Sequence, residues 1–172
     1  MKLSTKCLLA VIATSLPFMA VAYDSNLGPC SYPSNIYHYG DTAPDGGIVF
    51  KVTGDGCHGM EAATSNAGSG AKLTWEQAVI AAASYNETDI TTALTCSTTE
   101  AHTTPLCWHL PSKHELQLLH EQSDLVEGFT NGDYWSSTEA HNKYAWKMRF
   151  PHGQHSFSSI KNKYYARAIR FF

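Results

Sequence analysis

The segment Tyr144-Ala145-Trp146-Lys147-Met148-Arg149-Phe150 decides the fold class, because its side chains change character with a period of two. One set of alternate positions is aromatic or apolar, and the other holds alanine, lysine and arginine. This pattern predicts a β-strand with one face in the core and the other in solvent. A turn at Pro151-His152-Gly153 leads to another strand over residues 154–158, and residues 164–171 are expected to close the same sheet.

Two helices are predicted upstream of this strand, each from a capping box. In such a box a Ser or Thr side chain and a Glu or Gln three residues later satisfy the first backbone N–H groups of the helix. The boxes are Thr74-Trp75-Glu76-Gln77 and Ser112-Lys113-His114-Glu115. The first helix is expected to end near Tyr85 and the second near Ser123.

A hairpin of two further strands, over residues 48–52 and 57–63, is predicted before the first helix, with turn residues at Gly54-Asp55-Gly56. Three tryptophans are expected in the core: Trp108, Trp135 and Trp146. The chain is therefore predicted to be an α+β domain, with two short helices packed on a mainly antiparallel, twisted sheet.

The N-terminus is typical of a secretory signal peptide over residues 1–22. Lys2 and Lys6 accompany an apolar stretch, and Ala20-Val21-Ala22 has the small-x-small pattern of a cleavage site. We expect residues 23–45 to form an N-terminal arm and residues 46–172 a single domain. The protein would be exported to the periplasm, the cell surface or the medium. No apolar run reaches the ~18 residues of a membrane helix, so the chain is not expected to span a membrane.

Four cysteines follow the predicted signal peptide: Cys30, Cys57, Cys96 and Cys107. An even number in an exported chain predicts two disulfides, for which the sequence allows three connectivities. We favour Cys30–Cys57 and Cys96–Cys107, because each pair encloses a loop-rich segment and neither crosses a predicted helix. The Thr- and Ser-rich residues 86–105 are expected to form a long loop, either a binding loop or a disulfide-held insertion.

Charge is distributed unevenly along the chain. All fifteen acidic residues lie between Asp24 and Glu139, where three lysines oppose them (3 − 15 = −12). After Glu139 there is no acid, and seven Lys and Arg residues give +7. Without Lys2 and Lys6 the net charge is −5 (10 − 15), which makes nucleic acid an unfavoured partner. The basic end predicts a polyanion-binding face, and an equally weighted alternative is that it pairs with the acidic part of the same fold.

The candidate binding residues lie on or beside the predicted solvent face of the strand at 144–150. Alternate residues of a strand project ~6.6–6.8 Å apart on one side, which suits sulfate or carboxylate groups along a polysaccharide. The predicted ligand contacts are Lys143, Lys147, Arg149, Lys161, Lys163 and His141.

Catalytic and metal-binding patterns are incomplete in this sequence. His114-Glu115 lacks the second histidine of a zinc-protease helix, and residues 68–72 lack the Gly-Lys-Ser/Thr end of a phosphate loop. Ser136-Ser137 has no surrounding nucleophile elbow. Three C-terminal histidines are more typical of exposed turns than of a metal site: His141, His152 and His155. We predict no enzymatic activity, no cofactor and no metal.

Six short blocks occur in order along the chain. They are Gly46-Gly47-Ile48-Val49-Phe50, His58-Gly59-Met60-Glu61-Ala62-Ala63, Trp108-His109-Leu110-Pro111-Ser112-Lys113-His114-Glu115-Leu116, Tyr134-Trp135-Ser136-Ser137-Thr138-Glu139, Ala145-Trp146 and Ala166-Arg167-Ala168-Ile169-Arg170-Phe171. Together they resemble the Lcl C-terminal domain family, named for the C-terminal domain of the Legionella collagen-like adhesin, over about Gly46 to Phe172.

The resemblance implies a compact fold related to C-type lectin-like domains, and export from the cell. It also implies adhesin-like binding of sulfated glycosaminoglycans, as in the best-understood member, which is trimeric, and this leaves a homo-oligomer open. Two departures stand out: His109 occupies a position where the family usually has Arg, and no Gly-x-y collagen stalk is present. The calcium motifs of true C-type lectins are also missing, so calcium-dependent sugar binding is not implied.

The sequence therefore predicts an exported, disulfide-stapled, non-enzymatic binding domain for acidic or sulfated polysaccharide. The alternative is a protein–protein interaction or structural module of the cell envelope that binds no glycan.

Overall fold

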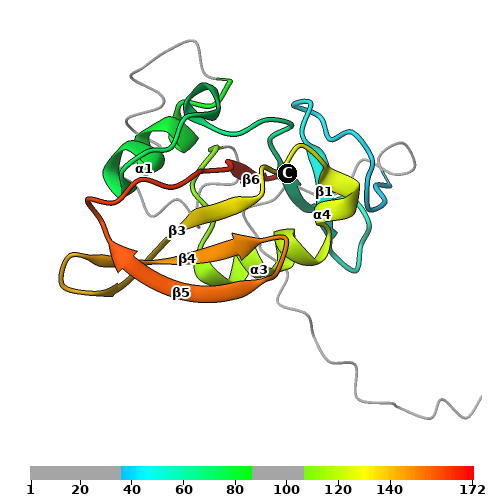
Figure 1. Ribbon diagram of the computed structural model, residues 1–172. Coiled ribbons are helices and arrows are strands. Elements are labelled where there is room, and N and C mark those ends of the chain that lie inside the picture. The colour runs from blue at the N-terminus through cyan, green and yellow to red at the C-terminus, as the bar shows by residue number, and fades with distance from the viewer. Residues whose placement is uncertain (1–35, 87–106) are drawn as a thin grey trace, which may run out of the picture.

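The computed structural model describes residues 36–86 and 107–172, which form an α+β domain with two small antiparallel sheets (Figure 1). The α+β class is confirmed, whereas the expected single sheet is wrong. The predicted signal peptide, most of the predicted arm and all but one residue of the predicted 86–105 loop lie outside the described residues. Cys57 and Cys107 each take part in a disulfide. Their predicted partners, Cys30 and Cys96, also lie outside the described residues, so the pairing stays a prediction.

The first sheet combines the early hairpin with the end of the chain. β1 (Ile48–Val52) and β2 (Gly59–Ala62) form the predicted hairpin, and β6 (Ile169–Phe171) pairs with β2 in the order β1-β2-β6. The prediction that residues 164–171 close the meander is correct only for the start of this segment, where Tyr165 forms a parallel bridge with Tyr134 of β3, and it is wrong for β6. The small, buried Ala166 and Ala168 let this segment run through the interior from one sheet to the other, where Ala168 O accepts the N–H of Ala63 at 2.9 Å.

The second sheet is the predicted meander. It consists of the consecutive antiparallel strands β3 (Gly132–His141), β4 (Tyr144–Phe150) and β5 (Gln154–Ser159), with β5 at its edge. The β3–β4 ladder carries two register shifts, one on each side of Glu139. Such bulges change which residues face each other across a hairpin. Here they place Asp133 opposite Arg149, whereas an uninterrupted ladder from the His141–Tyr144 pair would place it opposite His152.

Both predicted helices form, and both begin at their capping boxes. α1 (Trp75–Ala83) has Thr74 as its N-cap, and α3 (Lys113–Glu121) has Ser112. In each box the cap side chain accepts the N–H of the third helical residue, whose own side chain accepts the N–H of the cap. A four-residue helix, α4 (Ser123–Val126), follows α3, and a short 3₁₀ turn, η1 (Gly68–Gly70), precedes α1. The sequence pattern indicates neither of these.

Two hydrophobic clusters lie on opposite faces of the second sheet. In one, Met148 and Phe150 of β4 pack with Leu116 and Leu119 of α3. The other surrounds the fully buried Ala145 and brings together the following side chains: Ala78 and Ala82 of α1, with Trp108, Trp135, Ala166 and Ala168. The core positions predicted for Trp108 and Trp135 are confirmed.

The core side of β4 therefore changes along the strand, which corrects the predicted alternation. Ala145, expected in solvent, is buried, whereas Tyr144, expected in the core, is 38% exposed, and Trp146 is only partly buried. The reason is the placement of the covering elements. α3 lies over the Phe150 end of one face, and the segment 160–168 together with α1 lies over the Ala145 end of the other.

The fully buried side chain of Arg167 connects the two halves of the fold. Its Nη1 donates to Ala63 O at 2.7 Å, its Nη2 donates to Gly128 O at 2.6 Å, and its Nε donates to Asn66 Oδ1 at 3.2 Å. Its guanidinium carbon lies 4.2 Å from the ring centroid of Phe129. Burial lowers the pKa of Arg167, and the surrounding oxygens hold the cation in place. This arginine is a structural residue.

Candidate functional site

A pocket of about 570 Å³ lies on one face of the second sheet, where the sequence predicts a binding face. It is lined by Asp133, Lys147, Arg149, His152, Gln154, His155 and Ser156, and we call it the sheet pocket. The register explains this grouping, because residues directly opposite each other in neighbouring strands share a face. Arg149 stands opposite both Asp133 and Gln154, and Lys147 stands opposite Ser156.

An acidic residue in this pocket neutralises part of its charge. The Nζ of Lys147 lies 2.9 Å from Oδ2 of Asp133, and the two side chains are only 13% and 14% exposed. The ammonium group also lies 4.8 Å from the ring centroid of Tyr164. Arg149 is different: its guanidinium is 3.8 Å from Asp133 and its side chain is 50% exposed. Of the two predicted strand contacts, Arg149 is accessible to a ligand and Lys147 mainly supports the pocket.

The remaining predicted lysines lie at one end of the sheet. Lys143 is outside β4, in the turn between β3 and β4, where its carbonyl accepts the N–H of Ile160 at 3.0 Å. This bond joins the turn to the segment that leaves β5 and carries Lys161 and Lys163. All three side chains are exposed, and we call them the hairpin lysines. In residues 36–86 and 107–172 none of them forms an ion pair.

The alternative interpretation, in which the basic C-terminal residues pair with acidic residues of the same fold, is correct for Arg170. Arg170 contacts both Glu61, with 3.1 Å between Nε and Oε1, and Asp45. Glu61 has no exposed surface, and burial raises its pKa to about 7, while the N–H of Gly47 acts in the opposite direction. Arg170, Arg167 and Lys147 are thus used inside the domain, and the hairpin lysines and Arg149 face solvent.

The three C-terminal histidines form no metal-ligand group in the described part of the chain, although His152 and His155 both line the sheet pocket. His141, at the end of β3, contacts aromatic rings, and His152 is exposed in the turn that borders the sheet pocket. His155, on β5, has its pKa lowered by burial and by the nearby Lys113 and His120. Among the described residues, the one group with metal-ligand geometry is found elsewhere, at Asp55, Cys57 and His58.

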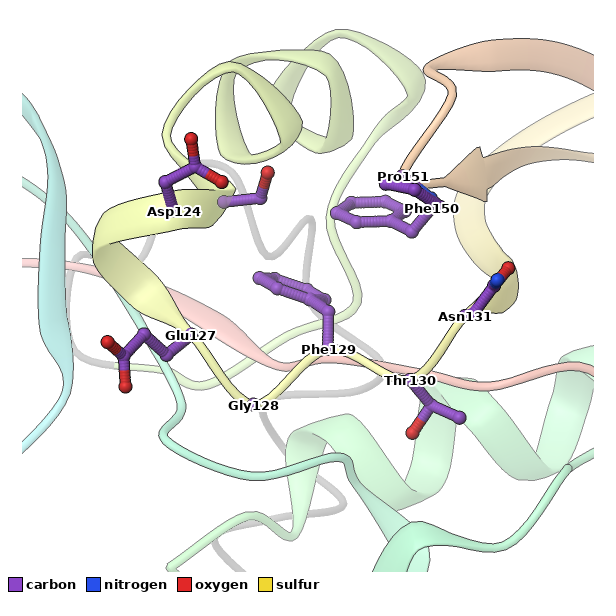
Figure 2. A pocket seen from close by; sticks show the side chains of 9 residues that line it. Asp124, Glu127, Gly128, Phe129, Thr130, Asn131, Phe150 and Pro151 are labelled. Atoms are coloured by element: carbon purple, nitrogen blue, oxygen red, sulfur yellow. The ribbon is translucent and has the colours of Figure 1, made fainter.

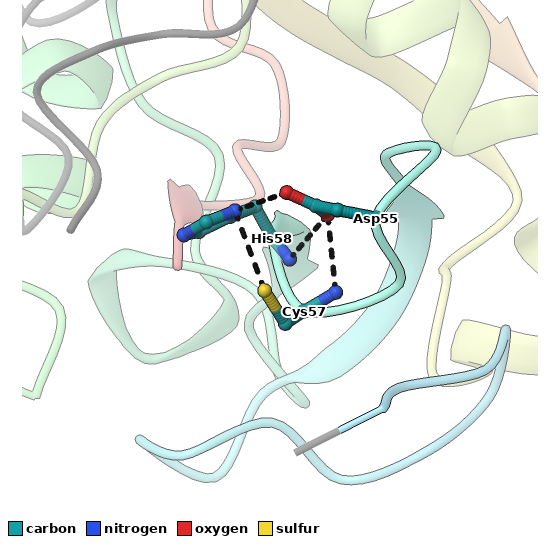
Figure 3. A group of neighbouring side chains, drawn as sticks. All are labelled: Asp55, Cys57 and His58. Atoms are coloured by element: carbon teal, nitrogen blue, oxygen red, sulfur yellow. Dashed lines mark hydrogen bonds and ion pairs between the residues drawn. The ribbon is translucent and has the colours of Figure 1, made fainter. Parts of the chain in front are cut away.

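That group is explained by the turn between β1 and β2 (Figure 3). Asp55 accepts the backbone N–H of Cys57 at 3.1 Å and of His58 at 3.3 Å, and its Oδ2 lies 2.7 Å from His58 Nδ1. Although partial burial acts against it, bonding to Thr53, His58 and Cys57 lowers the pKa of Asp55. Because Cys57 is disulfide-bonded, its sulfur is not a thiolate ligand. The carboxylate therefore organises a turn.

A second pocket, of about 440 Å³, lies between α4 and the turn after β4 (Figure 2). Its lining includes Asp124 and Asn131 beside the stacked rings of Phe129 and Phe150, whose centroids are 4.5 Å apart. Phe129 is covered by Phe150 and contacted by the guanidinium of Arg167. These contacts identify its aromatic wall as part of the core, so we assign no ligand to this pocket.

Sequence reasoning missed two features of the surface: the acid inside the sheet pocket and the exposed rings of Tyr144 and Phe157. The first depends on the register shifts in β3 and has no signal in the sequence. The second has a weak signal in the sequence, because Phe157 is the one large apolar residue in an otherwise polar strand.

The fold and its surface define a small α+β domain with two three-stranded sheets and exposed cations at one end of the second. The model of the Lcl C-terminal domain family matches residues 56–170, two thirds of the chain, and the chain belongs to this family. The matched range runs from the turn before β2 into β6, so it includes the second sheet and the hairpin lysines but leaves out β1 of the first sheet. Comparison with curated proteins gives no match.

Proposed function

We propose that this chain is an exported, non-enzymatic, adhesin-like domain that binds acidic or sulfated polysaccharide at the basic end of its second sheet. The observation that carries the proposal is the arrangement of Lys143, Lys161 and Lys163. All three are exposed, they lie on two hydrogen-bonded segments, and within the described ranges they form no ion pair. Exposed ammonium groups without carboxylate partners are suited to the sulfates and carboxylates of a flexible polymer.

Arg149 extends this surface toward the sheet pocket. Its half-exposed guanidinium can donate two parallel hydrogen bonds to one sulfate or carboxylate group. The exposed His152 borders the same pocket and offers a ring N–H as a further hydrogen-bond donor. His141, at the end of β3, lies beside the hairpin lysines in the turn region. Lys147, held by Asp133, is assigned a supporting role.

Membership of the Lcl C-terminal domain family supports the proposal in broader terms. By that likeness we also propose export and a fold related to C-type lectin-like domains. Within the described residues no helix has the length and apolar character needed to cross a membrane.

Binding of the purified, disulfide-intact protein to heparin, a carboxylated polysaccharide and neutral dextran, at two salt concentrations, tests the proposal. Binding should be restricted to the acidic polymers and should weaken with salt, because exposed charges are screened beyond ~8 Å at physiological ionic strength. The double variant Lys143→Ser/Lys161→Ser should bind about tenfold more weakly at low salt. The variant Lys51→Ser/Lys72→Ser removes the same charge from other parts of the surface and should bind as the wild type does.

Equal losses in both double variants would mean that only net charge matters and that the hairpin lysines are not a site. Wild-type binding to none of the polymers would refute polysaccharide recognition. It would favour the alternative, a protein-interaction or structural module of the envelope.

A further inference from the structure

A cluster of partly exposed aromatic rings lies on the second sheet, on the face opposite the sheet pocket. Its members are His141 of β3, Tyr144 and Trp146 of β4, and Phe157 of β5, and we call them the aromatic face. Phe157 stands directly opposite Trp146, with ring centroids 5.7 Å apart, and 6.0 Å from Tyr144 on the diagonal. The His141 ring lies 4.6 Å from Tyr144 and 5.1 Å from Phe157. The four rings therefore form one connected cluster.

The exposure of these rings follows from where α3 begins. Met148 and Phe150 project from β4 on the same face as Tyr144 and Trp146, and they are buried beneath α3 at 0% and 2% exposure. Lys113, the first residue of that helix, contacts Trp146, whereas Tyr144 and Phe157 are 38% and 50% exposed. Large aromatic groups left in solvent, such as Phe157 on the edge strand β5, cost free energy that a purely structural strand would avoid. Such surfaces commonly mark sites of interaction.

The charge around the aromatic face is positive. The Nζ of Lys113 lies 3.5 Å from the ring centroid of Trp146, and Lys143 directly precedes Tyr144 in the chain. Glu139 is the acidic residue of the β3–β4 hairpin that lies nearest to the rings along the sequence. It stands opposite Ala145, so its side chain projects on the sheet-pocket face. An anionic partner is therefore favoured over a neutral or cationic one.

We propose that the aromatic face is a stacking platform for the sugar rings of the acidic polysaccharide, with Lys113 and Lys143 beside its anionic groups. This inference rests on the proposed function. It adds recognition of the sugar rings, which the exposed cations alone do not provide. The faces of aromatic rings carry negative charge density, which attracts the slightly positive C–H groups of a pyranose. Tyr, Trp and His also bring polar groups that can bond to hydroxyls, and their few torsions lose little entropy on binding.

Affinity for heparin, measured by titration calorimetry of the full protein at several salt concentrations, tests the platform. Phe157→Ala should weaken binding on the order of five- to tenfold, the scale of one aromatic contact, without changing the salt dependence. Phe157→Trp should restore affinity and report binding through the fluorescence of the new indole. Phe157→Leu keeps apolar area without a π face and should remain weak. Ile80→Ala removes another half-exposed apolar side chain, from α1, and should have no effect.

The outcomes separate the two proposals. If Phe157→Ala and Phe157→Leu bind as the wild type does while Lys143→Ser/Lys161→Ser binds weakly, the platform is refuted and the basic site stands. If Phe157→Leu binds at full strength while Phe157→Ala does not, the face is merely apolar and stacking is refuted. If the wild type binds no acidic polymer, both proposals fail. The urea midpoint of each variant shows whether it is folded.

Discussion

The Nε2 atom of His109 lies 4.0 Å from Oε2 of Glu115, and both side chains are buried. His109 pairs with Ile169 of β6, and its Nδ1 lies 3.0 Å from Cys107 O, so Nε2 is directed at the carboxylate in α3. Glu115 also belongs to the capping box at Ser112, whose N–H it accepts at 2.7 Å. One carboxylate thus caps α3 and connects it to the end of the first sheet.

Glu115 should make the stability of the domain depend on acid. Burial acts to raise its pKa, but the nearby imidazole of His109 and the hydrogen bonds with Ser112 dominate and lower the pKa from 4.5 to about 2. A carboxyl with a lowered pKa stabilises the folded state above its ordinary pKa, and this contribution is lost as the pH falls from about 4.5 to about 2. Glu115→Gln should lower the free energy of unfolding by about 2–3 kcal/mol at pH 7, and by much less at pH 3. Urea titrations at both pH values measure this, with the exposed Glu121→Gln as control.

His109→Arg should stabilise the domain. Arginine reaches further than histidine, stays charged at all working pH values and can bond to a carboxylate with two parallel N–H groups. Its planar group can also replace the histidine ring that now stacks on Phe171, with centroids 5.7 Å apart. We expect a gain of about 1 kcal/mol in the free energy of unfolding at pH 8. Thermal unfolding at pH 8 is the measurement. A lower midpoint than that of the wild type would show that the lost bond to Cys107 O outweighs the new ion pair with Glu115.

The elements that could be predicted from sequence are those with local signals. The capping boxes at Thr74 and Ser112 specify the starts of α1 and α3 through hydrogen bonds within four residues of chain. The meander is equally local, because period-two patterns and the turn at residues 151–153 lie next to each other. The partner of β6 is not local, since pairing with β2 joins residues about one hundred positions apart.

The candidate site was harder to predict for the same reason. Charge counting puts Lys147 and Arg149 in an acid-free segment, but two bulges in β3 bring Asp133 opposite Arg149 and within ion-pair distance of Lys147. Alternation also assigned Tyr144 to the core, although α3 covers only the other end of that face. The first error concerns the register between two strands, and the second concerns which element covers a strand. Neither the register nor the cover is encoded in the sequence of the strand itself.

His155 should be replaceable with a gain in stability. In the described part of the chain neither of its ring nitrogens has a hydrogen-bond partner. Its pKa is lowered by burial and by Lys113 and His120, which both project from α3. A lowered histidine pKa means that the unfolded chain binds the proton more tightly, so stability falls as the pH drops below 6.5. His155→Phe should raise the free energy of unfolding by about 0.5–1 kcal/mol at pH 7 and by more at pH 5. Thermal melts at both pH values should show no such gain for His152→Phe, in the exposed turn.

Arg167 should be among the residues that the fold tolerates least. Its replacement leaves the carbonyls of Ala63 and Gly128 without a donor, and it removes the cation beside Phe129. Arg167→Met keeps much of the volume but should still cost about 3–5 kcal/mol, because buried carbonyl groups lose their hydrogen bonds. Chemical denaturation measures the loss, and the half-exposed Arg149→Met should change stability by less than about 1 kcal/mol. Equal midpoints for the two variants would contradict the structural role of Arg167.

Removal of the acid from the sheet pocket should strengthen polyanion binding while weakening the fold. Asp133→Asn leaves Lys147 and Arg149 without their carboxylate, so two cations become available in the pocket. Affinity for heparin at low salt should rise about threefold and its salt dependence should become steeper, because more charge takes part in binding. The free energy of unfolding should fall by about 1–3 kcal/mol, since the largely buried ammonium of Lys147 loses its partner. Asp124→Asn gives the same change in net charge from the other pocket and should alter neither quantity. If Asp133→Asn loses stability without gaining affinity, ligands contact only the hairpin lysines, and the sheet pocket is no part of the binding surface.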